Sequence, residues 1–142
     1  MGPVEQLFTA HLQRVDHHFA RFSTRVLPKF KLRSGAIGAL SLIIDNPGGS
    51  QNDIVKRTAY DKSAVNAIVT NLVEVGWVER RKSATDRRRY ELLVTPEGVQ
   101  NFNAYLEEVG KQEQFLLANL SSEAQQELIE LLKQLYLSCL RA

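Results

Sequence analysis

The chain has 142 residues, 44% of them hydrophobic and 24% charged, and its formal net charge is +2. This length predicts one domain with a single core, and the composition is ordinary for a soluble globular protein. The single cysteine, Cys139, excludes an internal disulfide and a cysteine-based metal site, and no apolar run approaches the roughly 18 residues that span a bilayer. The N-terminus also lacks the basic and apolar segments of a signal peptide, so we expect a cytoplasmic protein.

The first 45 residues predict two helices. Apolar side chains recur every three or four residues from 4 to 26, which indicates one face of a long helix that Pro28 ends. Residues 34–45 form a second, largely apolar segment, which the sequence Asn-Pro-Gly-Gly at 46–49 terminates. We expect a buried helix here, in which two glycines either weaken the helix or let another backbone approach closely.

Two shorter helices follow and form a helix-turn-helix. Ser50, with Asp53 three residues later, predicts the N-cap of a third helix over 51–58. After a tight turn, Asp61 caps a fourth helix over 62–75, and Gly76 is placed to end it. The predicted buried stripe of the fourth helix consists of Val65, Ile68, Val69 and Leu72.

A β-hairpin and two long helices complete the chain. Trp77-Val78 begins a strand, and residues 89–94 form the second one. Six of the ten residues at 80–89 are Lys or Arg, and Asp86 is the only acid among them. Thr95 and Pro96 then begin a helix that reaches about Asn119, and Ser121 or Ser122 caps a leucine-rich last helix.

This order of elements predicts a fold that is mainly α with a small β-hairpin wing: a winged helix-turn-helix flanked by long N- and C-terminal helices. We expect a single domain over 1–142, in which 34–98 bind DNA while 4–30 and 99–142 form dimerisation helices. The last helix carries a broad apolar stripe that needs a partner helix, and the simplest partner is a second copy of the chain. The stripe consists of Leu128, Ile129, Leu131, Leu132, Leu135, Tyr136 and Leu140.

The solvent face of the fourth helix suits the major groove of DNA. It carries small polar and basic side chains that bond to bases or phosphates, and an asparagine can pair with two edges of adenine. Residues near the start of such a helix reach deepest, and the helix N-terminus favours a phosphate. The alternative is the plain polar face of any amphipathic helix. The candidate contacts are Lys62, Ser63, Asn66 and Thr70.

The basic stretch predicts a wing that touches DNA. Arginines at the hairpin tip suit a phosphate backbone and a narrow minor groove, where negative potential is concentrated. We expect Asp86 to hold the guanidinium fork of an arginine by a two-point hydrogen bond. Residues on the outgoing strand add salt-dependent phosphate contacts. The alternative is a solvated loop. The candidates are Arg80, Arg81, Lys82, Asp86, Arg87, Arg88 and Arg89.

The sequence resembles the MarR (multiple antibiotic resistance regulator) family of winged-helix transcription factors. The matching motifs are Asp-Lys-Ser-Ala-Val at 61–65, Gly-Trp-Val-Glu-Arg at 76–80, Asp-Arg-Arg at 86–88 and Thr-Pro-Glu-Gly at 95–98. The resemblance implies a homodimer on a pseudo-palindromic operator, with Asp86 and Arg88 as the brace and the minor-groove arginine. Two positions depart from the family: Ala67, where many relatives carry an arginine, and Ala59, where a glycine is common.

The resemblance also implies a repressor that a small effector releases from DNA, such as an aromatic acid or its thioester. Polar residues of the first helix are the candidates to hold it, although surface or intersubunit roles are the alternative. They are Arg14, His17, His18, Arg21 and Arg25. We expect no metal site from His11, His17 and His18, which lack a carboxylate partner pattern, and we expect Cys139 to be a buried, inert thiol.

Three rival functions remain. An enzyme is disfavoured because the chain has no nucleotide loop, metal motif or nucleophile–base pair, and no cofactor is expected. A winged-helix protein–protein module would bury or neutralise the recognition face, which here stays polar. A constitutive DNA-binding protein without an effector is the third.

Overall fold

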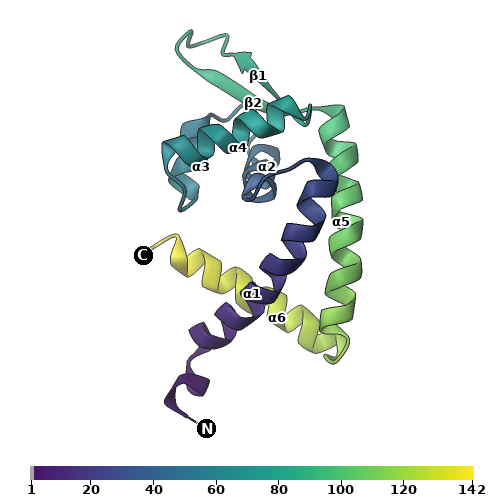
Figure 1. Ribbon diagram of the computed structural model, residues 1–142. Coiled ribbons are helices and arrows are strands. Elements are labelled where there is room, and N and C mark those ends of the chain that lie inside the picture. The colour runs from purple at the N-terminus through teal and green to yellow at the C-terminus, as the bar shows by residue number, and fades with distance from the viewer. Residues whose placement is uncertain (1) are drawn as a thin grey trace. The chain divides into compact units, whose positions relative to one another are not determined.

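The computed structural model describes residues 2–142, and the chain forms two compact units, one ending at Asn101 and one running from Phe102 to Ala142 (Figure 1). Across the described residues, no helix is both long and apolar enough to cross a membrane. The domain boundaries expected near residues 34 and 98 stay predictions.

The N-terminal segment is helical with one interruption. A 3₁₀ turn, η1 (Pro3–Gln6), precedes α1 (Phe8–Val26), so the expected helix over 4–26 is broken at Leu7. Pro28 ends α1, but the chain continues as a second 3₁₀ turn, η2 (Leu27–Phe30), because proline fits the first turn of a helix. The ring of Phe30 then packs edge-on against Trp77, with ring centroids 5.8 Å apart.

Three helices build the core of the first unit. They are α2 (Ala36–Asp45), α3 (Gln51–Arg57) and α4 (Lys62–Glu74). The expected capping box of α3 is confirmed, and the Asp61 carboxylate accepts from the Ala64 backbone N–H at 2.8 Å, as expected of an N-cap. All four residues of the predicted α4 stripe are buried: Val65, Ile68, Val69 and Leu72.

The two glycines of the second helical segment have different surroundings. Gly35 has a φ of +85° and lies where an added Cβ would meet Ile68 and Tyr60 at 2.9 Å. Side chains, not a backbone, therefore approach it. Gly38 has no atom within 4 Å of the position of a Cβ, so no close approach explains that glycine.

The wing is a two-stranded antiparallel hairpin of β1 (Val78–Lys82) and β2 (Tyr90–Val94), paired from Val78↔Val94 to Lys82↔Tyr90. The loop after α2 attaches to the free edge of β2. Leu92 donates to Gly49 O at 2.8 Å, and Gly48 donates to Leu92 O at 3.1 Å. Leu92 is also buried, so the base of the wing is fixed to the core.

The chain leaves the wing through a tightly bonded junction. The Thr95 hydroxyl donates to Gly76 O at 2.6 Å and accepts from the Gly98 N–H at 2.9 Å, so Thr95 ties the end of α4 to the start of α5 (Pro96–Leu117). A Cβ on Gly98 would collide with the Trp77 carbonyl. The Thr-Pro-Glu-Gly motif is thus explained by one hydrogen-bonding hydroxyl and one close backbone approach.

The second unit consists of the rest of α5 and α6 (Ser122–Cys139), whose N-cap Ser121 accepts from the Ala124 N–H at 3.1 Å. No residue of α6 is buried. The thiol of Cys139 is also exposed in the single chain, so the expectation of a buried thiol is wrong for this state. The exposed apolar side chains of α6 and of its C-cap residue Leu140 include Leu128, Ile129, Leu131, Leu132, Leu135, Tyr136 and Leu137.

Candidate DNA-binding surface

The candidate DNA-contacting residues on α4 are presented as the sequence predicts. Lys62, Ser63 and Asn66 are exposed, and Thr70 is half-buried. Asn71, at the margin of this face, instead forms hydrogen bonds within the protein. Its side chain accepts from the Arg33 N–H at 2.9 Å and donates to Lys31 O at 3.0 Å, so both ends of its amide are occupied.

Arg80 of β1 folds back over α4 rather than extending from the wing. Its Nη2 lies 2.8 Å from Gln51 Oε1, 3.3 Å from Thr70 Oγ1 and 3.5 Å from Asn66 Oδ1. Gln51 Nε2 donates to Asn66 Oδ1 at 3.3 Å. We call these four residues the Arg80 cluster. It joins α3, α4 and β1, and it could not be predicted from the sequence because its members are far apart along the chain.

The wing tip is organised around Ser83, the one buried polar residue among those described. The Ser83 hydroxyl lies 3.1 Å from that of Thr85 and accepts from the Asp86 N–H at 3.3 Å. Two backbone hydrogen bonds close the turn: the Ser83 N–H donates to Arg89 O and the Arg89 N–H donates to Asp86 O, both at 3.0 Å. Ser83 was missed at the sequence level, because serines are common in solvated loops.

Asp86 braces the tip differently from the prediction. Its Oδ1 accepts from the backbone N–H of Arg88 at 3.0 Å, an Asx-type contact two residues along the chain. The expected two-point bond to a guanidinium fork is therefore replaced by a bond to the backbone. Asp86 is the first residue of the turn that Arg89 N closes, so its short carboxylate reaches the N–H two residues on more easily than a long, exposed arginine head.

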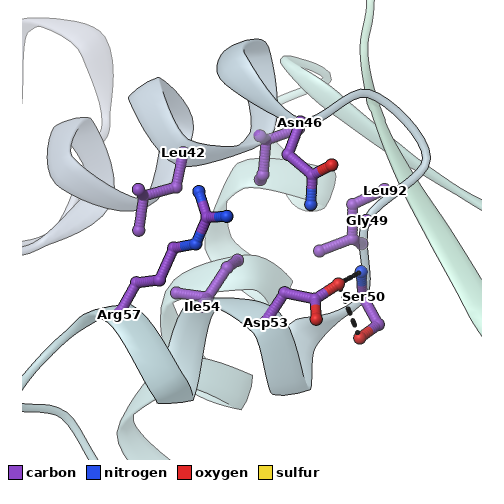
Figure 2. Close-up of a pocket in the computed structure, with 9 residues that line it drawn as sticks. Leu42, Asn46, Gly49, Ser50, Asp53, Ile54, Arg57 and Leu92 are labelled. Carbon is purple, nitrogen blue, oxygen red and sulfur yellow. Dashed lines mark hydrogen bonds between the residues drawn. The ribbon is translucent and has the colours of Figure 1, made fainter.

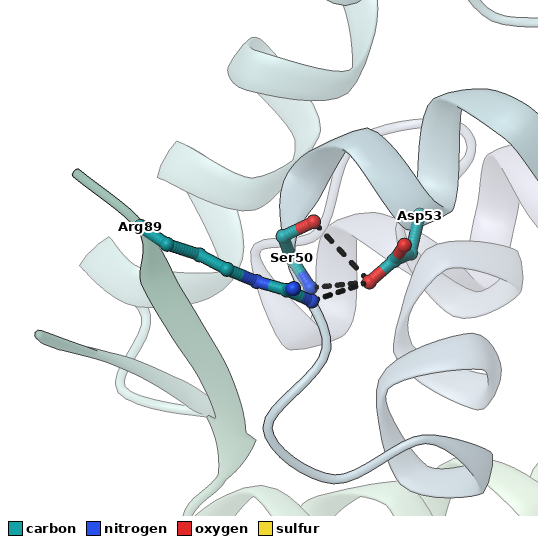
Figure 3. A network of polar contacts seen from close by, with 3 residues as sticks. All are labelled: Ser50, Asp53 and Arg89. Carbon is teal, nitrogen blue, oxygen red and sulfur yellow. Dashed lines mark hydrogen bonds and ion pairs between the residues drawn. The ribbon is translucent and has the colours of Figure 1, made fainter. Parts of the chain in front are cut away.

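Two other arginines of the basic stretch are held by carboxylates. Arg81 Nη2 lies 2.6 Å from Glu79 Oε1, on the exposed surface. Arg89 reaches across to α3, where its Nη2 lies 3.1 Å from Asp53 Oδ2 (Figure 3). The pKa of the Asp53 carboxyl is held below its ordinary value mainly by the Ser50 backbone N–H, with help from the Ser50 hydroxyl, Arg89 and Lys56, while partial burial opposes the shift.

Arg87 and Arg88 are left as the outward cations of the tip. Both side chains are exposed, and among the described residues neither guanidinium has an ion-pair partner. The six basic residues of 80–89 therefore form two groups. Arg80, Arg81 and Arg89 bond to other side chains of the protein, whereas the side chains of Lys82, Arg87 and Arg88 have no such partner in the part of the chain that the structure describes.

The candidate effector residues lie along α1. Arg14, His17 and His18 border an open depression of about 380 Å³ beside Val4, whereas Arg21 and Arg25 do not line it. The rings of His17 and His18 meet edge-on at 6.2 Å. Within the described part of the chain, no group of three or more His, Cys, Asp or Glu side chains is arranged to hold a metal ion.

A second hollow lies between α2, α3 and β2, and at its edge the Asp53 carboxylate bonds to Ser50 (Figure 2). Its volume of about 10 Å³ has room for about one water molecule, so it does not fit an effector.

Comparison with known proteins identifies relatives that are transcriptional regulators. The sequence model of the MarR family matches residues 32–89. The chain is 37% identical over 118 residues to a putative transcriptional regulatory protein for the hcr operon of Thauera aromatica, covering 83% of this chain and 71% of that one. The chain belongs to the MarR family.

Solved structures of MarR-family regulators share the fold. A crystal structure of MarR superposes with a TM-score of 0.87 at 22% identity, over 99% of this chain and 95% of the other. The organohalide-sensing regulator RdhR, in its 2,4-dichlorophenol-bound form, gives a TM-score of 0.72 at 20% identity. The superposition covers 99% of this chain and 86% of RdhR. The protein is thus a DNA-binding transcriptional regulator and not an enzyme, and the predicted fold class is confirmed.

Proposed function

We propose that this MarR-family regulator is a homodimeric repressor of a pseudo-palindromic operator, with α4 of each protomer in the major groove of one half-site. One observation carries the proposal. The free guanidiniums of Arg87 and Arg88 stand on a tip that hydrogen bonds hold rigid, beside a polar and exposed helix face. A rigid tip loses less conformational entropy when its arginines bind phosphate or a narrow minor groove.

The candidate residues take different parts in this proposal. Lys62 and Ser63, in the first turn of α4, reach base edges or a phosphate at the helix N-terminus. Arg87 and Arg88 contact the backbone and the minor groove. Asp86 shapes the tip. Asn66 and Thr70 face the groove while bonded to Arg80, and Arg81 and Arg89 contribute charge near the backbone while paired to Glu79 and Asp53.

The exposed apolar side chains support the homodimer. In a single chain, α6 leaves a run of leucines exposed to water. The start of α1 does the same with Phe8, Leu12, Val15 and the N-cap residue Leu7. Apolar area of this extent on two helices is typical of a surface that a partner covers. A second copy supplies the same surface through a two-fold axis, which also matches the symmetry of a palindromic operator.

We further propose a small aromatic acid or its thioester as the effector, acting on a protein in the cytoplasm. Arg14, His17 and His18 offer a cation and two imidazoles for a carboxylate, and they border one depression. Arg21 and Arg25 lie one and two turns further along α1. The RdhR regulator, which shares the fold, is described in a form bound to a substituted phenol.

The test of operator binding uses Arg88→Ala against Arg81→Ala. Both remove one positive charge from the wing, but Arg81 pairs with Glu79, whereas Arg88 has no ion-pair partner among the described residues. We expect Arg88→Ala to weaken binding to the operator severely while the dimer stays folded, and Arg81→Ala to have a much smaller effect. Equal affinity of Arg88→Ala and the parent across a salt titration contradicts the proposal. Native mass spectrometry of gently purified protein tests the dimer and the retained effector together.

A further inference from the structure

The Arg80 cluster fixes which way the Asn66 amide faces. An arginine has only donors, so every atom within bonding distance of Arg80 Nη2 must accept. Gln51 Oε1, Thr70 Oγ1 and Asn66 Oδ1 lie at 2.8, 3.3 and 3.5 Å from it. With Oε1 of Gln51 turned toward Arg80, its Nε2 faces Asn66 and donates to the same Oδ1 at 3.3 Å. The network therefore assigns both amide orientations.

The consequence for Asn66 is that its carbonyl oxygen is already engaged. Gln51 Nε2 donates to Oδ1 at 3.3 Å. Arg80 Nη2, whose two hydrogens also face Gln51 Oε1 and Thr70 Oγ1 at shorter distances, adds a long contact to Oδ1 at 3.5 Å. The Nδ2 group keeps its two N–H donors, and Asn66 lies on the exposed face of α4. Toward a groove, this asparagine therefore offers two unengaged donors, whereas its acceptor oxygen is the atom bonded to Gln51.

Donors alone cannot make the usual two-point pairing of asparagine with adenine. That pairing needs the amide oxygen to accept from adenine N6 while the amide nitrogen donates to N7. In the major groove guanine shows two acceptors, N7 and O6. Adenine and thymine each show one acceptor, and cytosine shows only a donor. Guanine is therefore the edge that a donor-only amide fits best.

We propose that Asn66 reads guanine rather than adenine, and that Arg80 and Gln51 determine this preference by occupying Oδ1. The inference rests on the proposed placement of α4 in the major groove. Arg80 and Gln51 are positioning residues here: they act on the base through Asn66 and need not touch DNA. The bidentate adenine contact expected from the sequence is replaced, because the asparagine is bonded to a strand and a helix that sequence spacing does not bring near it.

The experiment selects bound duplexes from a randomised pool with the full-length parent, Asn66→Ala, the double variant Gln51→Ala/Arg80→Ala, and Arg81→Ala. Asn66→Ala identifies the base pair that Asn66 reads, as the position whose preference disappears. Arg81→Ala is the matched control for base preference, because it removes a neighbouring β1 arginine that pairs with Glu79 and not with Asn66. A charge near the phosphate backbone changes affinity for all sequences alike and not the preference for one base. Circular dichroism checks that each variant is folded.

At the position identified by Asn66→Ala, we expect the parent and Arg81→Ala to prefer guanine over adenine by on the order of tenfold. The double variant frees Oδ1, so guanine and adenine become comparable or adenine leads. The inference is overturned if the parent selects adenine there, if the guanine preference survives in the double variant, or if Asn66→Ala changes no position. A parent that selects no sequence at all overturns the proposed function itself.

Discussion

Arg89 Nη2 lies 3.1 Å from Asp53 Oδ2, and the same carboxylate oxygen accepts from the Ser50 backbone N–H at 2.8 Å (Figure 3). One oxygen atom thus links the return strand of the wing to the N-terminus of α3. The contact ties the tip end of the wing to the helix-turn-helix, in addition to the bonds that join Leu92 to Gly48 and Gly49 at its base. We infer that Arg89 holds the wing in position more than it binds DNA.

Arg89→Ala should therefore behave differently from Arg88→Ala. We expect Arg89→Ala to lower the free energy of unfolding by less than about 1 kcal/mol, because the pair is partly exposed. Operator affinity should fall moderately, with little change in its dependence on salt. Arg88→Ala should instead reduce the salt slope by about one phosphate contact. Affinities measured from low to high salt for both variants check this, and equal losses of slope would place Arg89 on the DNA.

The same carboxylate predicts an acid dependence of stability. The pKa of Asp53 in the folded protein is below its ordinary value of 3.8. A depressed folded pKa means that the carboxylate stabilises the fold above the unfolded pKa, and that this stabilisation is lost as the pH falls through the folded value. We expect Asp53→Asn to be less stable than the parent at neutral pH, with the difference shrinking below about pH 4. Denaturant unfolding at several pH values measures the free energy of unfolding of both proteins. A difference between them that stays constant with pH contradicts the prediction.

The helices and the hairpin were predictable because their signals are local. Ser50 with Asp53, Asp61 and Ser121 each cap a helix within three residues of their own position, and Gly76 ends α4 by a positive φ of +82°. Such signals act through backbone geometry over one turn of chain. The break at Leu7 was missed, because the apolar pattern runs through η1 and α1 without interruption.

The partners of the charged side chains could not be predicted in this way. Arg89 and Asp53 are 36 residues apart, and Arg80 bonds to Gln51 from 29 residues away. A run of arginines indicates positive charge, but which of them stays free depends on how β1 and β2 pack beside α3 and α4. The sequence therefore predicted which segments carry the candidate DNA-binding residues, but it did not predict that Arg80, Arg81 and Arg89 bond to other side chains of the protein.

The backbone contact of Asp86 leads to a prediction that distinguishes two roles of its side chain: accepting from the Arg88 N–H, or pairing its charge with a guanidinium. If Asp86 shapes the tip by accepting from the Arg88 N–H, then Asp86→Asn keeps an oxygen at the same place and Asp86→Ala removes it. We expect Asp86→Asn to bind the operator about as well as the parent, and Asp86→Ala to bind more weakly. If a guanidinium needed the carboxylate charge, both variants would be equally impaired. Operator affinities at one salt concentration distinguish the two outcomes.

Gly98 and Gly38 form a matched pair for testing the junction between the wing and α5. A Cβ at Gly98 collides with the Trp77 carbonyl, whereas a Cβ at Gly38 meets no atom within 4 Å. Because backbone cannot move aside as a flexible side chain does, Gly98→Ala should destabilise the fold by about 1–3 kcal/mol. Gly38→Ala should leave stability unchanged or raise it by up to about 1 kcal/mol, since alanine favours a helix. Thermal and denaturant unfolding compare them, and a Gly98→Ala variant as stable as Gly38→Ala would show that the close approach does not constrain the junction.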